Sequence, residues 1–148
     1  MRKLIFTLTA ALFSLTSYAQ IEKPVTWSYA AKKTSATEAI IYLKATIEDG
    51  WHLYSQFVKA GGPVKTTITF DKSPLFTLVD KTTEPKPITK FESTFNMNVS
   101  YFEKSVIFQQ KVKLKGKTAL VKGKLEFMVC DDHQCLPPEE IAFSVSIK

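Results

Sequence analysis

The run Leu125-Glu126-Phe127-Met128-Val129-Cys130-Asp131-Asp132-His133-Gln134-Cys135-Leu136-Pro137-Pro138-Glu139 holds both cysteines of the 148-residue chain. A strand-like segment precedes Cys130, and a second alternating segment spans residues 141–147. Polar, turn-forming residues between two such segments are typical of a β-hairpin. Opposed residues of an antiparallel pair have Cα atoms about 4.5 to 5.5 Å apart, which is within the span of a disulfide. The pattern therefore predicts a hairpin whose two cysteines face each other near its tip and are able to bond.

Several uses of this cysteine pair are compatible with its spacing. A bridge across so short a loop stabilises the fold by roughly 2 kcal/mol, against about 4.7 kcal/mol for a 100-residue loop. An exposed bridge is also one that an incoming thiolate can reach. A redox bridge and a plain structural bridge therefore stay open as equal alternatives.

Metal binding and cysteine-protease chemistry are less favoured by the same residues. Zinc needs four ligands, and although Asp131, Asp132 and His133 lie between the cysteines, a second ligand pair is missing from the sequence. A cysteine protease would pair a lone cysteine with a histidine such as His52. The presence of a second cysteine fits disulfide chemistry better.

In much of the rest of the chain, apolar and polar residues alternate with a period of two. In Glu38–Ile47, apolar residues alternate with polar ones, and residues 64–70, 106–114 and 120–129 follow the same rule. Seven to nine short strands, with turn signals every 8 to 12 residues, predict an all-β fold, an antiparallel β-sandwich of immunoglobulin type. The Cys…Trp…Cys spacing of true immunoglobulin domains is lacking.

Two segments depart from this regularity. Residues 80–87 contain two prolines, which are excluded from a central strand. Residues 88–102 have no clean period and carry four aromatic rings, so we expect a long irregular stretch. Such stretches are often functional, and the alternative is that the rings only fill the core.

The N-terminus has the pattern of a secretory signal peptide. Met1-Arg2-Lys3 is followed by an apolar run to Leu15 and by Ser17-Tyr18-Ala19. Cleavage after Ala19 leaves residues 20–148 as one domain and lowers the formal net charge from +6 to +4. Export places the cysteines in an oxidising compartment. The densest lysine run, at residues 111–117, is interpreted as a solvated strand edge and turn rather than a nucleic-acid site.

The cysteine hairpin carries a family resemblance. Residues 130–139 resemble the active-site hairpin of the N-terminal periplasmic domain of the thiol:disulfide interchange protein DsbD. Asp49-Gly50-Trp51-His52-Leu53-Tyr54 is similar to a second family segment, and residues 95–108 align without a gap on the family's cap loop and following strand. The resemblance covers most of the chain after Asp49.

This resemblance implies roles for individual residues. Cys130 and Cys135 would shuttle between dithiol and disulfide, with Cys135 forming the mixed disulfide and Cys130 resolving it. Phe95 would be the shielding aromatic of a cap loop that includes Asn96 and Met97. His52 and Tyr54 match two tyrosines beside the family's active site, so His52 is a substitution.

Carboxylates near the cysteines are placed differently from the family pattern. An acidic pair of the best-known family member aligns with Ser93 and Thr94, which puts a carboxylate role there in doubt, and Glu92 is a possible replacement. The acidic residues around the cysteines disfavour a thiolate, whereas a protonated His133 favours one.

The resemblance also implies partners. The protein would be an exported, periplasmic electron carrier, reduced by a thioredoxin-like domain, that reduces periplasmic disulfide isomerases or cytochrome c maturation proteins. We expect a monomer that needs no cofactor or metal, binds no nucleic acid and meets the membrane only through a partner protein. The alternative is a non-catalytic immunoglobulin-like binding module with a structural bridge. Full-length family members also carry a membrane conduit and a thioredoxin-like C-terminal domain, so the sequence is either a fragment or a free-standing version.

Overall fold

The computed structural model describes residues 22–148. The predicted signal peptide, residues 1–19, lies outside this range and stays a prediction. Within the range no helix is long and apolar enough to cross a membrane. The strands in chain order are β1 (Val25–Lys33), β2 (Glu38–Ile47), β3 (His52–Tyr54), β4 (Thr67–Phe70), β5 (Phe76–Thr83), β6 (Ile88–Glu92), β7 (Met97–Phe102), β8 (Ser105–Leu114), β9 (Ala119–Phe127), β10 (Val129–Cys130) and β11 (Glu139–Ile147).

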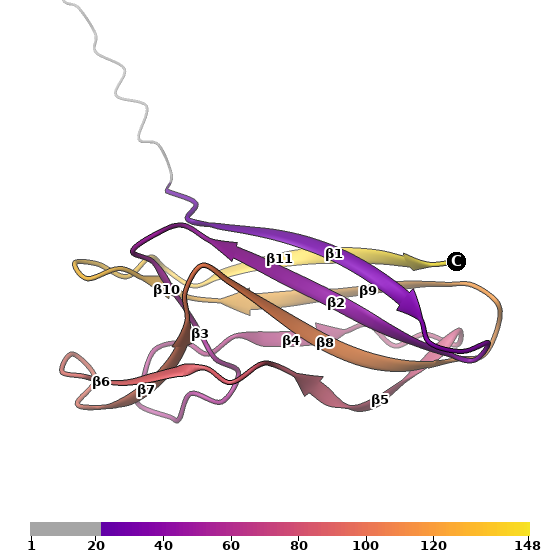
Figure 1. Ribbon diagram of the computed structural model, residues 1–148, viewed down its shortest axis with the longest axis horizontal. Helices are drawn as coiled ribbons and strands as arrows, with labels where there is room; N and C mark the ends of the chain where they lie inside the picture. Colours follow the sequence, from indigo (N-terminus) through magenta and orange to yellow (C-terminus); the bar gives the residue numbers. More distant parts are fainter. Residues whose placement is uncertain (1–21) are drawn as a thin grey trace, which may run out of the picture.

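Two antiparallel sheets form a sandwich (Figure 1). One has the strand order β1-β2-β8-β5 and the other β11-β9-β4. Their inner faces meet in one core, to which β2 contributes every second residue from Ala39 to Ile47. In β8 and β9 the buried positions alternate in the same way. The alternation expected from the sequence in these three strands is therefore confirmed.

A third sheet, made of short strands, holds the cysteine region. Its strand order is β10-β3-β7-β6, and it lies at the left-hand end of the molecule in Figure 1. Strand β10 follows β9 after one residue, and β11 returns along β9 with Glu139 opposite Phe127. The cysteine segment thus connects two strands of the main sandwich, as the hairpin prediction required. The fold class is confirmed: an all-β, immunoglobulin-like antiparallel sandwich with a cysteine hairpin.

The stretch from Ile88 to Phe102 is more regular than expected. It forms a β-hairpin, β6 and β7, around a turn at residues 93–96 in which Asn96 has a φ of 52°. The expectation of a long irregular stretch is wrong. Strand β6 is an edge strand, and four of its five residues are exposed. A strand with no buried face has no reason to alternate, which is why residues 88–92 show no period in the sequence.

Strand β5 contains a bulge that a buried glutamine supports. The register against β8 shifts between Val79 and Thr83, and Asp80 has a φ of 58°. The Gln110 side chain is 1% exposed, donates from Nε2 to the carbonyl of Val79 at 3.0 Å, and accepts from the Thr82 hydroxyl at 2.8 Å. It replaces the ladder hydrogen bonds that the bulge removes. Both prolines of residues 80–87 fall outside the strand.

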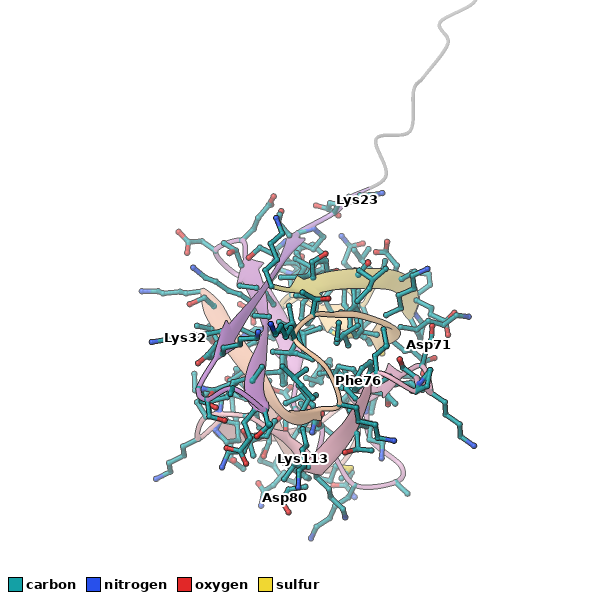
Figure 2. All side chains as sticks on the ribbon, turned by 90° about the vertical axis from the view of Figure 1, so that its right-hand side faces the viewer. Lys23, Lys32, Asp71, Phe76, Asp80 and Lys113 are labelled. Atoms are coloured by element: carbon teal, nitrogen blue, oxygen red, sulfur yellow. A yellow bond between two sulfur atoms is a disulfide. The ribbon has the colours of Figure 1, made fainter. Side chains whose placement is uncertain are left out.

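The end of the sandwich opposite the cysteines is rich in exposed lysines. Figure 2 looks onto this end, with Lys32 and Lys113 at the surface and Phe76 buried between the sheets. Lys111 and Lys113 lie on the outer face of β8, which is a central strand. The lysine run at residues 111–117 was expected to form a strand edge and a turn. It lies instead on the solvent-exposed face of a central strand, and the expected turn follows.

Candidate functional site

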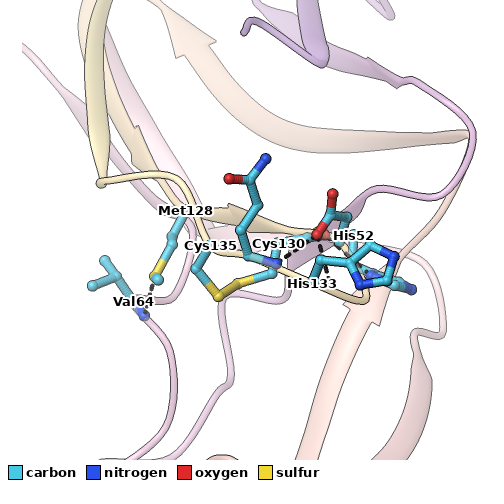
Figure 3. The surroundings of a disulfide bond; sticks show 8 residues. His52, Val64, Met128, Cys130, His133 and Cys135 are labelled. Atoms are coloured by element: carbon cyan, nitrogen blue, oxygen red, sulfur yellow. Dashed lines mark hydrogen bonds between the residues drawn. A yellow bond between two sulfur atoms is a disulfide. The ribbon is translucent and has the colours of Figure 1, made fainter.

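The two cysteines are bonded to each other. Cys130 ends β10 and forms an isolated antiparallel bridge with Cys135, and their Cα atoms are 4.0 Å apart. The predicted closure of the pair is therefore present in the structure (Figure 3). The Leu136 N–H also donates to the carbonyl of Val129 at 2.9 Å. This hydrogen bond closes the loop independently of the sulfur atoms.

The loop between the cysteines is organised by Asp131. Its Oδ1 accepts hydrogen bonds from the main-chain N–H of His133 at 2.7 Å and of Gln134 at 2.6 Å. This arrangement is an Asx turn. The two N–H groups favour the charged carboxylate and hold the pKa of Asp131 below its usual value. The charge of Asp131 is therefore engaged in holding the turn.

The two sulfur-bearing residues differ in accessibility. Cys130 is 4% exposed and packs in a small cluster with Tyr54, Val99 and Tyr101. Cys135 is exposed at the surface of the loop. An attacking thiolate has to approach a sulfur directly, and Cys135 is the more exposed residue of the pair.

His52 lies opposite Cys130 on the neighbouring strand. The two residues are partners in the β10–β3 register, and His52 Nδ1 donates to the Cys130 carbonyl at 3.2 Å. Its Nε2 is 3.1 Å from Glu103 Oε1, and its ring meets the ring of Tyr101 edge-on with centroids 4.5 Å apart. Both nitrogens of the ring therefore have fixed partners.

Two tyrosines complete the wall behind Cys130. Burial, then the negative charge of Glu92 and the proximity of Tyr101, raise the pKa of Tyr54 to about 12. Burial raises the pKa of Tyr101 as well, with smaller contributions from Glu103 and other acids. Both hydroxyls therefore stay protonated at neutral pH. They surround the buried sulfur with neutral, polarisable groups.

The residues predicted to form a cap loop are placed unevenly around the site. Phe95 is half-buried, packs against the cluster of Cys130 and lines a pocket of about 420 Å³ that contains both cysteines. His52, Tyr54 and Glu92 line the same pocket. Met97 packs against the cluster from β7. Asn96 is exposed and does not line the pocket, and its left-handed backbone shapes the turn instead.

Sequence reasoning gave no site role to two residues of this pocket region, Tyr101 and Glu103. Met97, Val99 and Tyr101 alternate on one face of β7, a signal that could have found Tyr101. Glu103 lies in the β7–β8 turn, where nothing in the sequence distinguishes it. Ser93 and Thr94 line the pocket together with Glu92, so a carboxylate does lie beside the two positions that the resemblance aligns with an acidic pair.

Comparison with known proteins agrees with the family resemblance found in the sequence. The family model "Thiol:disulfide interchange protein DsbD, N-terminal" matches residues 21–147. No curated protein matches the sequence.

Solved structures share the fold at low sequence identity. The N-terminal periplasmic domain of ScsB from Proteus mirabilis is 20% identical with a TM-score of 0.54, over 83% of this chain and only 44% of that chain. The reduced DsbD N-terminal domain from Neisseria meningitidis is 16% identical with a TM-score of 0.52, over 81% and 84%. A complex between the DsbD and PilB N-terminal domains of the same organism gives 14% identity and a TM-score of 0.55, over 84% and 87%. Since the family model matches nearly the whole of the described structure, this chain belongs to the family of N-terminal domains of the thiol:disulfide interchange protein DsbD.

Proposed function

We propose that this domain is a periplasmic electron carrier that works by thiol-disulfide exchange at Cys130 and Cys135. A thioredoxin-like domain would reduce it, and it would then reduce periplasmic disulfide isomerases or cytochrome c maturation proteins. The observation that carries the proposal is the asymmetry of the bridge, in which Cys135 is an exposed residue and Cys130 is a buried one. The similarity in fold to the N-terminal periplasmic domain of ScsB supports a periplasmic location.

The geometry suits a two-step exchange. A thiolate of the reduced partner attacks Cys135 Sγ, a new intermolecular S–S bond forms, and the Cys130–Cys135 bond breaks with its electron pair on Cys130 Sγ. The partner's second thiolate then attacks the partner's own sulfur of the mixed disulfide. It releases Cys135 as a thiolate, so that this domain leaves as a dithiol and the partner as a disulfide. The domain gains two electrons and needs no cofactor for this step.

The framework survives opening of the bridge. Closing so short a loop stabilises the folded state by only about 2 kcal/mol. The hairpin is also held by nine residue pairs between β9 and β11, from Glu139↔Phe127 to Ile147↔Ala119. We therefore expect a folded dithiol form. Phe95 would shield the bridge until a partner displaces it.

A trapping experiment tests this proposal. Cys130→Ser leaves the exposed Cys135 alone. Its thiolate is expected to displace thionitrobenzoate from a thioredoxin-like domain whose resolving cysteine is replaced by serine and whose other cysteine carries thionitrobenzoate as a mixed disulfide, which gives a stable mixed disulfide between the two proteins. Cys135→Ser is the matched control, because it leaves only the buried Cys130 and is expected to trap far less partner. Equal trapping by both variants would contradict the assigned roles.

A redox titration separates the carrier from a simple binding module. The wild-type protein is equilibrated in dithiol buffers of graded potential, quenched in acid and alkylated, and circular dichroism follows the fold. The carrier gives one two-electron transition in the range of thioredoxin-like partners with the fold unchanged. A bridge too reducing to exchange with any such partner would identify a non-catalytic immunoglobulin-like module.

A further inference from the structure

The two cysteines lie between two main-chain hydrogen bonds that do not involve sulfur. On one side the Leu136 N–H donates to the Val129 carbonyl at 2.9 Å, and on the other side the Asp131 N–H donates to the Gln134 carbonyl at 2.9 Å. The cysteines are opposed between these bonds, with Cα atoms 4.0 Å apart. Reduction breaks the S–S bond but neither hydrogen bond. The main chain is therefore able to keep the two thiols opposite each other in the dithiol form.

Both ends of the cysteine loop are anchored in the fold. Cys130 belongs to β10 and pairs with His52 of β3. Leu136 is half-buried and packs against the main core. The two prolines that follow it, Pro137 and Pro138, each have a restricted φ. The freedom that the loop gains on reduction is therefore confined to residues 131–135.

Asp131 makes three of the hydrogen bonds that shape this short segment. Its N–H donates to the Gln134 carbonyl, and its Oδ1 accepts from the N–H groups of His133 at 2.7 Å and of Gln134 at 2.6 Å. A carboxylate is a stronger acceptor than a neutral oxygen. The neighbouring Asp132 is exposed in the same pocket, and its side chain makes no hydrogen bond in the described part of the chain. The order of the loop therefore depends on the first of the two aspartates.

We propose that Asp131 is a positioning residue of the exchange reaction: its turn holds the two thiols of the reduced domain close together, so that Cys130 resolves mixed disulfides quickly and the bridge resists reduction. This inference rests on the proposed function. In the step concerned, an S–S bond joins Cys135 to an oxidised acceptor. The Cys130 thiolate attacks Cys135 Sγ, and the acceptor sulfur leaves as a thiolate with the electron pair of the broken bond. A disordered loop would lower the effective concentration of one thiol at the other.

Ring closure is timed with a small disulfide, dithiobis-nitrobenzoate, added below the concentration of the dithiol protein. Attack by Cys135 releases one thionitrobenzoate, at a rate that scales with protein concentration. Attack by Cys130 on the resulting mixed disulfide releases a second, at a rate that does not. Asp131→Ala is expected to slow this second phase about tenfold, the effect of losing the net stabilisation of one hydrogen bond to a charged group. Asp131→Asn keeps an oxygen acceptor for the turn and is expected to close within about twofold of the wild-type rate.

The same variants are compared at equilibrium in dithiol buffers of graded potential. The bridge of Asp131→Ala is expected to form about tenfold less favourably than that of the wild type, which makes its reduction potential less negative by about 30 mV. Asp132→Ala is the matched control, because it removes the same charge from the same pocket without touching the turn, and it should stay within about twofold of the wild type in both measurements. Wild-type closure in Asp131→Ala, no recovery in Asp131→Asn, or an equal effect of Asp132→Ala overturns the inference.

A measurement on the wild type keeps the inference falsifiable if Asp131→Ala fails to fold. Amide hydrogen exchange, followed by NMR, is expected to show the N–H groups of His133 and Gln134 equally protected in the disulfide and dithiol forms, whereas loss of their protection on reduction overturns the inference. Failure of the proposed function looks different, because the wild-type bridge then exchanges with no thioredoxin-like domain. A wild type that exchanges while Asp131→Ala closes at the wild-type rate refutes only this inference.

Discussion

Replacement of Gly123 by alanine tests how tightly the smaller sheet of the sandwich is packed. Gly123 lies in β9, the central strand, opposite Phe143 of β11 and Phe70 of β4. A Cβ atom at this position would lie 2.2 Å from the Thr69 carbonyl oxygen and 2.6 Å from Cζ of Phe143. Both distances are far below van der Waals contact.

The structure indicates which elements must give way. The Thr69 oxygen belongs to the main chain, so no side-chain rotation removes the overlap. Phe143 is 4% exposed and its ring packs against that of Phe70 with centroids 5.4 Å apart. Strand β4 is an edge strand of four residues that pairs only with β9. We therefore expect β4 to be displaced.

The expected loss of stability is about 2 kcal/mol, the upper end of the overpacking cost less the entropic offset. Overpacking a core costs about 1 to 3 kcal/mol and more when main chain must move. The lower entropy of the unfolded alanine chain offsets about 0.4 to 1 kcal/mol of that. Urea unfolding of the oxidised protein, followed by tryptophan fluorescence, measures the difference.

Gly116→Ala is the matched control for this substitution. Among residues 22–148, nothing lies within 4 Å of a Cβ atom built on Gly116. Surface substitutions of this kind change stability by about 0.5 kcal/mol or less. If Gly123→Ala is as stable as the wild type, or if Gly116→Ala loses as much, the packing argument is refuted.

Three other predictions follow from single side chains. Gln110→Leu removes the donor to the main-chain carbonyls of Val79 in β5 and Lys111 in β8 and is expected to cost about 1 to 3 kcal/mol in urea unfolding, whereas an unchanged midpoint would contradict this role. The folded state raises the pKa of Tyr54 from 10.0 to about 12. Its neutral hydroxyl therefore contributes stability that is complete below pH 10 and is lost as the pH rises toward 12. In a spectrophotometric titration, Tyr54→Phe should lack one late-ionising tyrosine that the wild type shows. Phe95→Ala is expected to speed reduction of the bridge by dithiothreitol several-fold, because the shielding ring that lines the pocket is lost, and an unchanged rate would show that Phe95 is not a lid.

The sequence alone was sufficient to predict the strands of the sandwich core. In β2, β8 and β9 the residues that alternate as apolar in the sequence are the ones the structure buries. A period of two records directly which face of a strand is covered. The cysteine hairpin could also be predicted from the sequence, because a short turn brings its two sides together locally. The family resemblance pointed to Phe95, Tyr54 and His52 as neighbours of the cysteines, and the pocket contains all three.

Only the tertiary structure decided how the two sulfurs differ. Cys130 is buried because β3 and β7, from distant parts of the sequence, bring Tyr54 and Tyr101 against it, while Cys135 projects from the loop. The contact between His52 and Glu103 likewise joins residues that no local pattern links. Strand β6 has no buried face, and so its sequence carried no period to detect. Local patterns record burial along one strand, whereas the chemistry of this site depends on which strands become neighbours.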